Sequence, residues 1–379
     1  YITLMKNNSS IVPFHPLIQR WFENRFQTPT DIQSKAWPVI SQGEHVLVCA
    51  PTGTGKTLTA FLWAINQLIT GHWEEGQTHV LYISPLKALN TDIRENLLVP
   101  LKEIRHLFTE QGEPFPSVRI LTRSGDTPTA QRRAMVQRPP SILITTPESL
   151  NLIISSPRAR SILKHLKTVI LDEIHAVAHD KRGALLSMSV EQLVMLSGEF
   201  QRIALSATIR PAEIAARFAG GYKLFRDENG NAAYEPRPVR VLISDQHKKL
   251  QISVKGLLHD KVTAGETDTV WRSLAAQCDE IIRKNRATLI FVNNRRLSER
   301  IVLYINNLHD TPCVYSHHGS LSRELRQEVE HRLKSGNLKA IVATSSLEMG
   351  IDIGNIDEVV LVQTPVSVSS SLQRIGRAG

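Results

Sequence analysis

Two short segments of this sequence combine residue types that could bind a nucleoside triphosphate together with its metal ion. Residues 50–57 read APTGTGKT and lie between an apolar, β-branched run and a stretch with helical spacing. A tight Gly-containing loop between a strand and a helix aims backbone N–H groups at one point, where a polyphosphate fits. Residues 168–173 read TVILDE, an apolar strand that ends in two carboxylates. Alone, the first could be an ordinary turn and the second a solvated strand end, but together they predict a triphosphate site.

Each residue type in this site has an expected task. Lys56 can reach the β- and γ-phosphates, while the Thr57 hydroxyl and Asp172 can hold Mg²⁺. Glu173 can orient and deprotonate the attacking water. We therefore expect Lys56 and Glu173 to be catalytic, with ATP and Mg²⁺ as cofactors. The usual pattern begins with Gly, whereas this loop has Ala50 in that place. The other loop residues expected to bind the nucleotide are Thr52, Gly53, Thr54 and Gly55.

The composition is typical of a soluble globular protein with room for two domains. The 379 residues are 41% hydrophobic and 21% charged. No run of about 18 apolar residues predicts a membrane-spanning helix. The first residues lack the basic-then-apolar design of a secretion signal, so we expect a cytoplasmic protein with no membrane partner. The absence of a starting Met indicates a fragment of a longer chain.

Charge and cysteine usage narrow the class of partner. The formal net charge of +9 favours a polyanion, and the absence of any block of about five like charges favours a groove over a basic tail. Cys49, Cys278 and Cys313 are far apart and lack ligand spacing, which disfavours a disulfide framework or a zinc site. His317 and His318 could suggest a metal, but a loop after a short strand is the favoured interpretation.

Apolar strand-like runs recur along the chain with helical stretches between them. This spacing predicts βαβ units and parallel sheets, and continuous apolar runs predict α/β domains whose sheets are covered on both faces. Residues 226–238 hold a dense cluster of turn formers, so we predict domains at residues 1–240 and 241–379. Period-two alternation predicts a half-exposed strand at residues 248–255. Buried strands are predicted at residues 45–49, 80–84, 118–121, 141–146, 168–173, 202–207, 288–292, 313–316, 339–344 and 358–363.

The order of short motifs along the whole chain resembles that of superfamily 2 helicases. The phosphate loop, DEIH at residues 172–175 and QRIGRAG at residues 373–379 follow one another as in those proteins. Longer stretches resemble the large-helicase-related (Lhr) family, namely PTDIQSKAWPVISQGEHVLVCAPTGTGKTLTAFL, SPLKALNTDIRENL, SGDTP, ITTPESL, DEIHAVAHDKRGALLSMSVEQL, HHGSLSRE and VATSSLEMGIDIG. The resemblance implies two tandem RecA-like domains, each a mainly parallel sheet with helices on both faces.

The resemblance also assigns further residues to the ATP site. Gln33, which follows Phe26, Pro29 and Thr30, resembles the residue that recognises the adenine edge, since its amide can both donate and accept. A helix-start cap is the alternative interpretation of Gln33. The second-domain residues that resemble nucleotide contacts are Gly350, Asp352, Gln373, Arg374 and Arg377, with Gln373 and the arginine finger Arg377 taken as catalytic. A solvated helix start is the alternative for the two arginines.

A second set of residues resembles the nucleic-acid face and its link to the ATP site. A translocase must contact the nucleic-acid backbone, because it cannot depend on sequence. The residues that look like backbone contacts are Ser84, Lys87, Ser124, Thr146, Pro147, Asn293, Arg295, Thr344 and Ser345. Those that look like the coupling between the two sites are His175, Ser206 and Thr208. A helix N-cap is the simpler alternative for each hydroxyl. No exposed aromatic stacking platform is predicted.

The resemblance implies ATP-dependent 3′ to 5′ translocation along single-stranded DNA and unwinding of duplex DNA or RNA–DNA hybrids in DNA repair. An RNA helicase stays open as an alternative, because telling RNA from DNA needs 2′-OH contacts that the sequence does not reveal. A nucleotide-dependent clamp that binds nucleic acid without unwinding it also stays open. A small-molecule kinase is disfavoured, since it predicts one α/β domain and no RIGRAG element. The sequence leaves the oligomeric state open.

Overall fold

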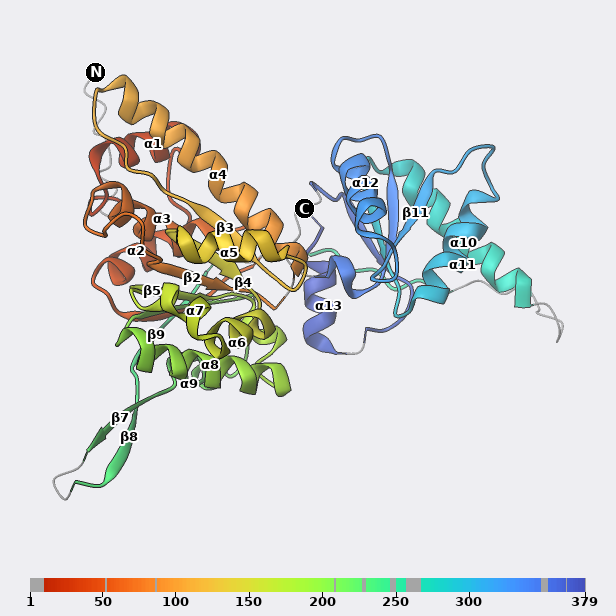
Figure 1. Ribbon diagram of the computed structural model, residues 1–379. Helices are drawn as coiled ribbons and strands as arrows, with labels where there is room; N and C mark the ends of the chain where they lie inside the picture. The colour runs from red at the N-terminus through yellow and green to blue at the C-terminus, as the bar shows by residue number, and fades with distance from the viewer. Residues whose placement is uncertain are drawn as a thin grey trace. The chain divides into compact units, whose positions relative to one another are not determined.

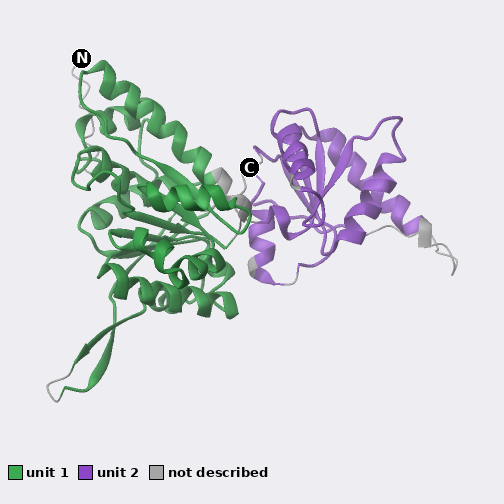
Figure 2. Ribbon diagram, in the orientation of Figure 1, with its two compact units in different colours: residues 1–247 green, residues 248–379 purple. Residues whose placement is uncertain are grey.

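The computed structural model forms two compact units, residues 1–247 and 248–379, which Figure 2 shows in different colours. It describes residues 10–51, 53–85, 87–207, 209–226, 230–245, 250–256, 267–348, 354–365 and 367–378, with the backbone alone at residues 87–92, 267, 268, 323 and 369. No helix in these ranges is long and apolar enough to cross a membrane. Residue 240, where the predicted domain boundary falls, lies within a strand of the first unit, and the division at that point stays a proposal.

The first unit is built on a seven-stranded sheet with the order β3-β4-β2-β5-β6-β1-β9 (Figure 1). Every neighbouring pair in it is parallel. Its strands are β1 (His45–Cys49), β2 (Val80–Ile83), β3 (Ile120–Arg123), β4 (Ile142–Thr145), β5 (Thr168–Leu171), β6 (Gln201–Ser206) and β9 (Val239–Ile243). Six of these seven had been predicted as buried strands, and the parallel α/β architecture is confirmed.

Alternate residues of these strands enter two separate cores, one on each face of the sheet. Val46, Val48 and Tyr82 pack on one face, and Leu47 and Ile83 pack on the other. The first face is covered by α1 (Pro16–Phe26), α2 (Asp31–Ser41), α3 (Lys56–Ile69) and α4 (Lys87–Glu110). The second is covered by α6 (Pro147–Ser155), α7 (Pro157–Arg160), α8 (Lys181–Ser197) and α9 (Ala212–Gly220). Burial on both faces explains why these strands are continuously apolar rather than alternating.

A two-stranded antiparallel ribbon of β7 (Tyr222–Arg226) and β8 (Ala232–Pro236) projects from the first unit (Figure 1). Residues 226 and 232–236 of the turn-former cluster, after which the sequence predicted a domain boundary, thus lie in the two strands of this ribbon. Tyr222, Leu224 and Tyr234 are exposed on it. Two buried arginines at its base, Arg202 and Arg237, bind Glu191 at 2.9 and 3.0 Å and so anchor the ribbon to the sheet.

The second unit has a four-stranded parallel sheet in the order β11-β12-β10-β13. Its strands are β10 (Thr288–Phe291), β11 (Val314–His317), β12 (Ala340–Ala343) and β13 (Glu358–Leu361). Its helices are α10 (Thr267–Lys284), α11 (Arg295–Asn306), α12 (Arg323–Lys334) and α13 (Val368–Ile375). Helices α10 and α11 pack on one face of the sheet and α12 on the other, so this unit has a core of its own.

One predicted strand is wrong. A strand was predicted at residues 248–255. Residues 250–255 are exposed and have no regular secondary structure, and residues 248 and 249 lie outside the described ranges. Period-two alternation alone did not make a strand here, because no neighbouring strand pairs with the described part of this segment. The strand β9, which pairs with β1, was missed instead.

Candidate nucleotide and nucleic-acid site

The candidate residues of the first unit meet at one edge of its sheet. In a parallel sheet the carboxyl ends of all strands lie at the same edge, which is where open α/β sheets bind ligands. The register pairs Cys49 of β1 with Ser206 of β6, and Leu171 of β5 with Ile83 of β2. Strand β6 lies between β1 and β5, so the phosphate loop after β1 and the carboxylates after β5 flank it.

The loop between β1 and α3 takes its shape from two glycines in the left-handed region. Gly53 has a φ of 83° and Gly55, the N-cap of α3, a φ of 81°. A Cβ on Gly55 would come within 2.7 Å of the Gln33 amide nitrogen. The buried Lys56 folds back across the loop, where its Nζ donates to the carbonyl of Ala50 at 2.5 Å and to that of Pro51 at 3.2 Å. The lysine therefore already lies over the loop that would cradle phosphate.

Asp172 lies buried at the end of β5 and accepts hydrogen bonds from two donors. The Tyr82 hydroxyl donates to its Oδ2, and the backbone N–H of Glu173 donates to its Oδ1 at 2.8 Å. Burial, and then the neighbouring Glu173 carboxylate, raises the pKa of Asp172 to about 7, against the opposing effects of Tyr82 and Lys56. Because the Lys56 cation opposes this rise, we expect the lysine to stabilise the ionised carboxylate.

Glu173 has the strained geometry that functional residues often carry. Its φ is 49°, one of two non-glycine residues with positive φ in the described chain. Its Oε2 is buried and has no hydrogen-bond donor among the described residues, although His175 Nδ1 lies 3.4 Å away. His175 in turn contacts Ser206 Oγ at 3.1 Å, which joins the end of β5 to the end of β6. The carboxylate is thus fixed in place with one oxygen left for a further donor.

Gln33 is part of a helix cap, as the alternative interpretation held. Its Oε1 accepts from the backbone N–H of Thr30 at 2.9 Å, and the Thr30 hydroxyl accepts from the Gln33 N–H at 3.4 Å. This reciprocal pair is a capping box that starts α2. The Thr30 hydroxyl also donates to the carbonyl of Thr54 at 3.0 Å, so the cap is attached to the phosphate loop. The cap uses the Oε1 of Gln33, and recognition of adenine by its amide stays a prediction.

The residues present fit a magnesium-bound triphosphate. Lys56 supplies a buried cation, Thr57 at the start of α3 supplies a partly exposed hydroxyl, and Asp172 supplies a carboxylate of the kind that Mg²⁺ prefers. The Glu173 oxygen without a donor lies in the same site and can accept a proton or hydrogen bond. These are the groups that such a ligand requires, on strand ends that the fold brings together.

The other half of the same edge carries the candidate nucleic-acid residues of the first unit. Ser124 follows β3, Thr146 and Pro147 follow β4, and Ser84 follows β2. The Thr146 hydroxyl accepts from the backbone N–H of Ser149 at 3.3 Å. Thr146 is therefore the N-cap of α6, which was the alternative to a nucleic-acid contact. Ser84 is fully buried. Only Ser124 of these four residues is partly exposed.

Two arginines at this edge were missed by sequence reasoning. Arg123 ends β3, and burial followed by the nearby charge of Arg132 lowers the pKa of its guanidinium. Arg132, on α5 (Thr129–Gln137), donates to the carbonyls of Ser124 and Gly125 at 3.4 and 2.7 Å. Two like charges held close together favour an anion beside them. A strand that ends in Arg immediately before SGDTP was the available signal.

The second unit brings two candidate residues, Asn293 and Arg374, into one network beside α13. The buried Arg374 donates to Asn293 Oδ1 at 3.1 Å and to Glu348 Oε2 at 3.3 Å, and its guanidinium carbon lies 5.3 Å from the centroid of the Phe291 ring. Its side chain therefore fastens α13 to the end of β10. Gln373 lies on the same helix, and Arg377 follows it and is partly exposed.

The remaining second-unit candidates follow strand ends. Arg295 begins α11 and donates to Ser320 Oγ at 3.2 Å. Thr344 and the exposed Ser345 follow β12, where Thr344 makes no side-chain cap. The candidates Thr52, Thr208, Gly350 and Asp352, together with the side chain of Lys87, lie outside the described residues.

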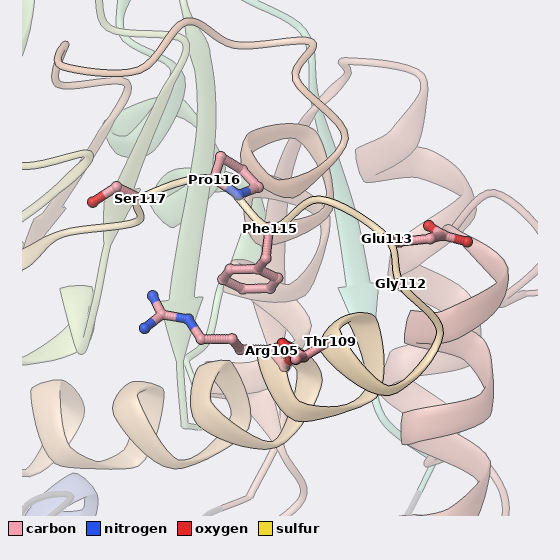
Figure 3. Close-up of a pocket in the computed structure, with 7 residues that line it drawn as sticks. All are labelled: Arg105, Thr109, Gly112, Glu113, Phe115, Pro116 and Ser117. Carbon is pink, nitrogen blue, oxygen red and sulfur yellow. The ribbon is translucent and has the colours of Figure 1, made fainter.

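A separate hollow of about 600 Å³ lies beside the end of α4 (Figure 3). Its lining includes Arg105, which lies 5.0 Å above the ring of Phe115. The lining ends at Ser117, which precedes β3, so the hollow is at the amino edge of the sheet. It is therefore remote from the phosphate loop.

Comparison with protein families gives the class that this fold and site define. The DEAD/DEAH box helicase family matches residues 30–216, and the helicase conserved C-terminal domain matches residues 273–379. Together these matches include the phosphate loop, the DEIH segment and the RIGRAG segment. The tandem RecA-like architecture expected from the sequence is confirmed.

Among the DEAD/DEAH box helicases, this chain is similar to several Lhr helicases over nearly its whole length. An ATP-dependent helicase Lhr-Core protein 2 of Thermococcus barophilus is 44% identical over 367 residues, which are 96% of this chain and 42% of that protein. An Lhr helicase/probable uracil glycosylase of Mycolicibacterium smegmatis is 41% identical over 97% of this chain and 26% of its own length. A solved structure of Mycobacterium smegmatis helicase Lhr bound to ssDNA and AMP-PNP has a TM-score of 0.85 at 43% identity, over 97% of this chain and 46% of that one.

The chain belongs to the DEAD/DEAH box helicases, and it has Lhr helicase homologues at 41–44% identity over nearly its whole length. It spans less than half the length of these relatives.

Proposed function

We propose that this chain is the motor of an ATP-dependent helicase that moves 3′ to 5′ on single-stranded DNA and unwinds duplex DNA or RNA–DNA hybrids. The relatives named as ATP-dependent helicases, and the Lhr structure bound to ssDNA and AMP-PNP, support ATP and DNA as ligands. A role in DNA repair is supported by the relative whose name joins Lhr helicase to uracil glycosylase. We also propose a cytoplasmic location, as expected from the sequence. Polarity and hybrid unwinding rest on the family resemblance alone.

The observation that carries the proposal is the meeting of Lys56, Asp172 and Glu173 at the carboxyl ends of β1 and β5, which flank β6. Bound Mg²⁺ would neutralise charge on the phosphates and polarise the bond that breaks. Lys56 and the loop N–H groups would hold the phosphates, and Thr57 with Asp172 would hold the metal. Glu173, with its uncommitted Oε2, would orient the attacking water and accept its proton.

The residues of the second unit complete this proposed mechanism. We assign Arg377 the role of an arginine finger and Gln373 a place beside it, on the resemblance of QRIGRAG to the helicase motif. Arginine fingers contribute roughly 10³ to 10⁵ in rate, so a finger on a separate domain makes hydrolysis depend on domain position. Arg374 takes a supporting role in this proposal, because Asn293, Glu348 and Phe291 already engage it.

The decisive experiment is ATP hydrolysis measured with single-stranded DNA, with single-stranded RNA and with no polymer. The proposal expects single-stranded DNA to raise the rate above that of the protein alone. Stimulation by RNA alone would support an RNA helicase. Hydrolysis that neither polymer changes would leave a clamp or an unrelated nucleotidase and would contradict the motor function.

A further inference from the structure

A buried tyrosine connects the two halves of the carboxyl edge in the first unit. Tyr82 lies in β2 with no exposed surface, and its ring packs against that of Phe61 with centroids 5.3 Å apart. Its hydroxyl donates to Asp172 Oδ2 and is also hydrogen-bonded to the buried hydroxyl of Ser84. The three side chains form a continuous chain from Ser84 through Tyr82 to Asp172.

The order of the strands shows which two parts of the site these three hydrogen-bonded side chains connect. The ends of β3, β4 and β2 carry the candidate nucleic-acid residues, and the ends of β5, β6 and β1 carry the candidate nucleotide residues. Strands β2 and β5 are neighbours, so the boundary between the two sets runs between them. The Tyr82–Asp172 hydrogen bond crosses that boundary. Ser84 directly follows the last residue of β2.

A merely space-filling residue would not need the hydroxyl at this position. The ring alone fills the core beside Phe61, and a buried phenol must find a partner for its O–H. Here the partner is the carboxylate proposed to hold the metal, whose other oxygen accepts from the Glu173 N–H at 2.8 Å. Each oxygen of Asp172 thus has one fixed donor, which sets the orientation of the group. Outer partners of this kind orient metal ligands in proteins.

We propose that Tyr82 is a positioning residue that orients Asp172 for Mg²⁺–nucleotide and that, with Ser84, ties the metal carboxylate to the nucleic-acid half of the edge. The inference rests on the proposed function, since it assigns Asp172 to the metal. In it, binding of a single strand at the end of β2 changes the support that Tyr82 gives to Asp172. Ser84 acts inside the protein as the first member of the chain, because its burial keeps it from direct contact with nucleic acid.

The test is the substitution Tyr82→Phe, which removes one oxygen and keeps the ring. Binding of a fluorescent non-hydrolysable ATP analogue is titrated with Mg²⁺, and thermal unfolding is followed in parallel. The Mg²⁺ concentration for half-saturation should rise about tenfold, as on losing an outer-shell partner of a metal ligand. Analogue affinity at saturating Mg²⁺ should be close to that of the parent. The matched control is Tyr315→Phe in β11 of the second unit, which should leave the Mg²⁺ titration unchanged.

The connection to nucleic acid has its own measurement. Affinity for single-stranded DNA is determined with and without the Mg²⁺–analogue, in the parent and in Tyr82→Phe. The ratio of the two affinities measures the coupling, and it should move toward one in the variant. A Tyr82→Phe protein with a parental Mg²⁺ titration and a parental ratio would overturn the inference and leave the proposed function standing. A parent that binds no Mg²⁺–analogue would instead contradict the proposed function itself.

Discussion

At the scale of single residues, different side chains of the nucleotide site are suited to binding the ligand and to accepting a proton. Lys56 is buried and bound to loop carbonyls, and Asp172 has a protein donor on each oxygen. Glu173 is different, because its backbone is strained and one of its oxygens lacks a donor among the described residues. A group that must accept a proton cannot have all its lone pairs committed, so the structure itself marks Glu173 as the candidate base.

This separation predicts different defects for two substitutions. Lys56→Ala should weaken ATP binding, since it removes the cation that meets the phosphates. Glu173→Gln keeps the shape and should retain ATP while turnover falls by roughly 10²- to 10⁴-fold, the range of general-base catalysis. Binding is followed with a fluorescent ATP analogue and turnover by phosphate release. Glu235→Gln on the exposed hairpin is the matched control. Parental turnover in Glu173→Gln would remove its role in activating water.

At the scale of elements, the phosphate loop is packed against the start of α2. Thr30 caps α2 and also binds the Thr54 carbonyl, and Gln33 of the same cap lies against Gly55. The loop therefore depends on a helix that precedes it in the sequence. The FQTPTDIQ segment resembled an adenine-recognition element, and the structure shows that it also supports the loop.

Two glycines of the loop permit a matched test of this packing. Both have positive φ, but a Cβ on Gly53 meets nothing within 4 Å, whereas one on Gly55 reaches the Gln33 amide. Gly53→Ala should cost about 1–2 kcal/mol of stability for the left-handed backbone. Gly55→Ala should cost about 1 kcal/mol more, because it displaces the cap. Urea unfolding followed by tryptophan fluorescence measures this, since four of the five tryptophans lie in the first unit. Equal losses would show that the contact with Gln33 adds no stability.

At the scale of the whole molecule, two units with separate cores share an excess of positive charge. The chain carries a formal net charge of +9, and the candidate backbone contacts follow strand ends in both units. A groove of this kind would bind nucleic acid chiefly through phosphates, and such binding releases counterions. Paired guanidiniums such as Arg123 and Arg132 are suited to this task.

Binding of single strands should therefore fall steeply with salt. About five phosphate contacts predict a slope of about −3.5 in log affinity against log salt. Arg132→Gln should reduce the slope by about 0.7, while Arg158→Gln on α7 should leave it unchanged. Fluorescence anisotropy of a labelled oligonucleotide between low and high salt gives both values. A flat titration would argue against a phosphate groove.

The predictable part of the fold was local. Continuous apolar runs predict buried strands such as β1 and β5, and helical spacing of apolar residues predicts α3. Most strands were therefore predicted within two residues of their observed bounds. The hairpin β7–β8 and strand β9 were not predicted, because turn formers look alike in a linker and in a hairpin. Exposed aromatic residues on that hairpin, Tyr222 and Tyr234, were likewise beyond the reach of composition.

The local sequence reveals which chemistry is available, because Lys56, Thr57, Asp172 and Glu173 have few other reasons to occur in such motifs. Their types and local spacing depend only on neighbours in the chain. Which groups each of these side chains contacts depends on the folded structure instead. The order of parallel strands puts Asp172 beside Tyr82, some ninety positions earlier in the chain, and the packing of helices decides that Ser84 is buried and Ser124 is partly exposed. Long-range pairing depends on how apolar faces are shared between distant segments, and no local pattern records that.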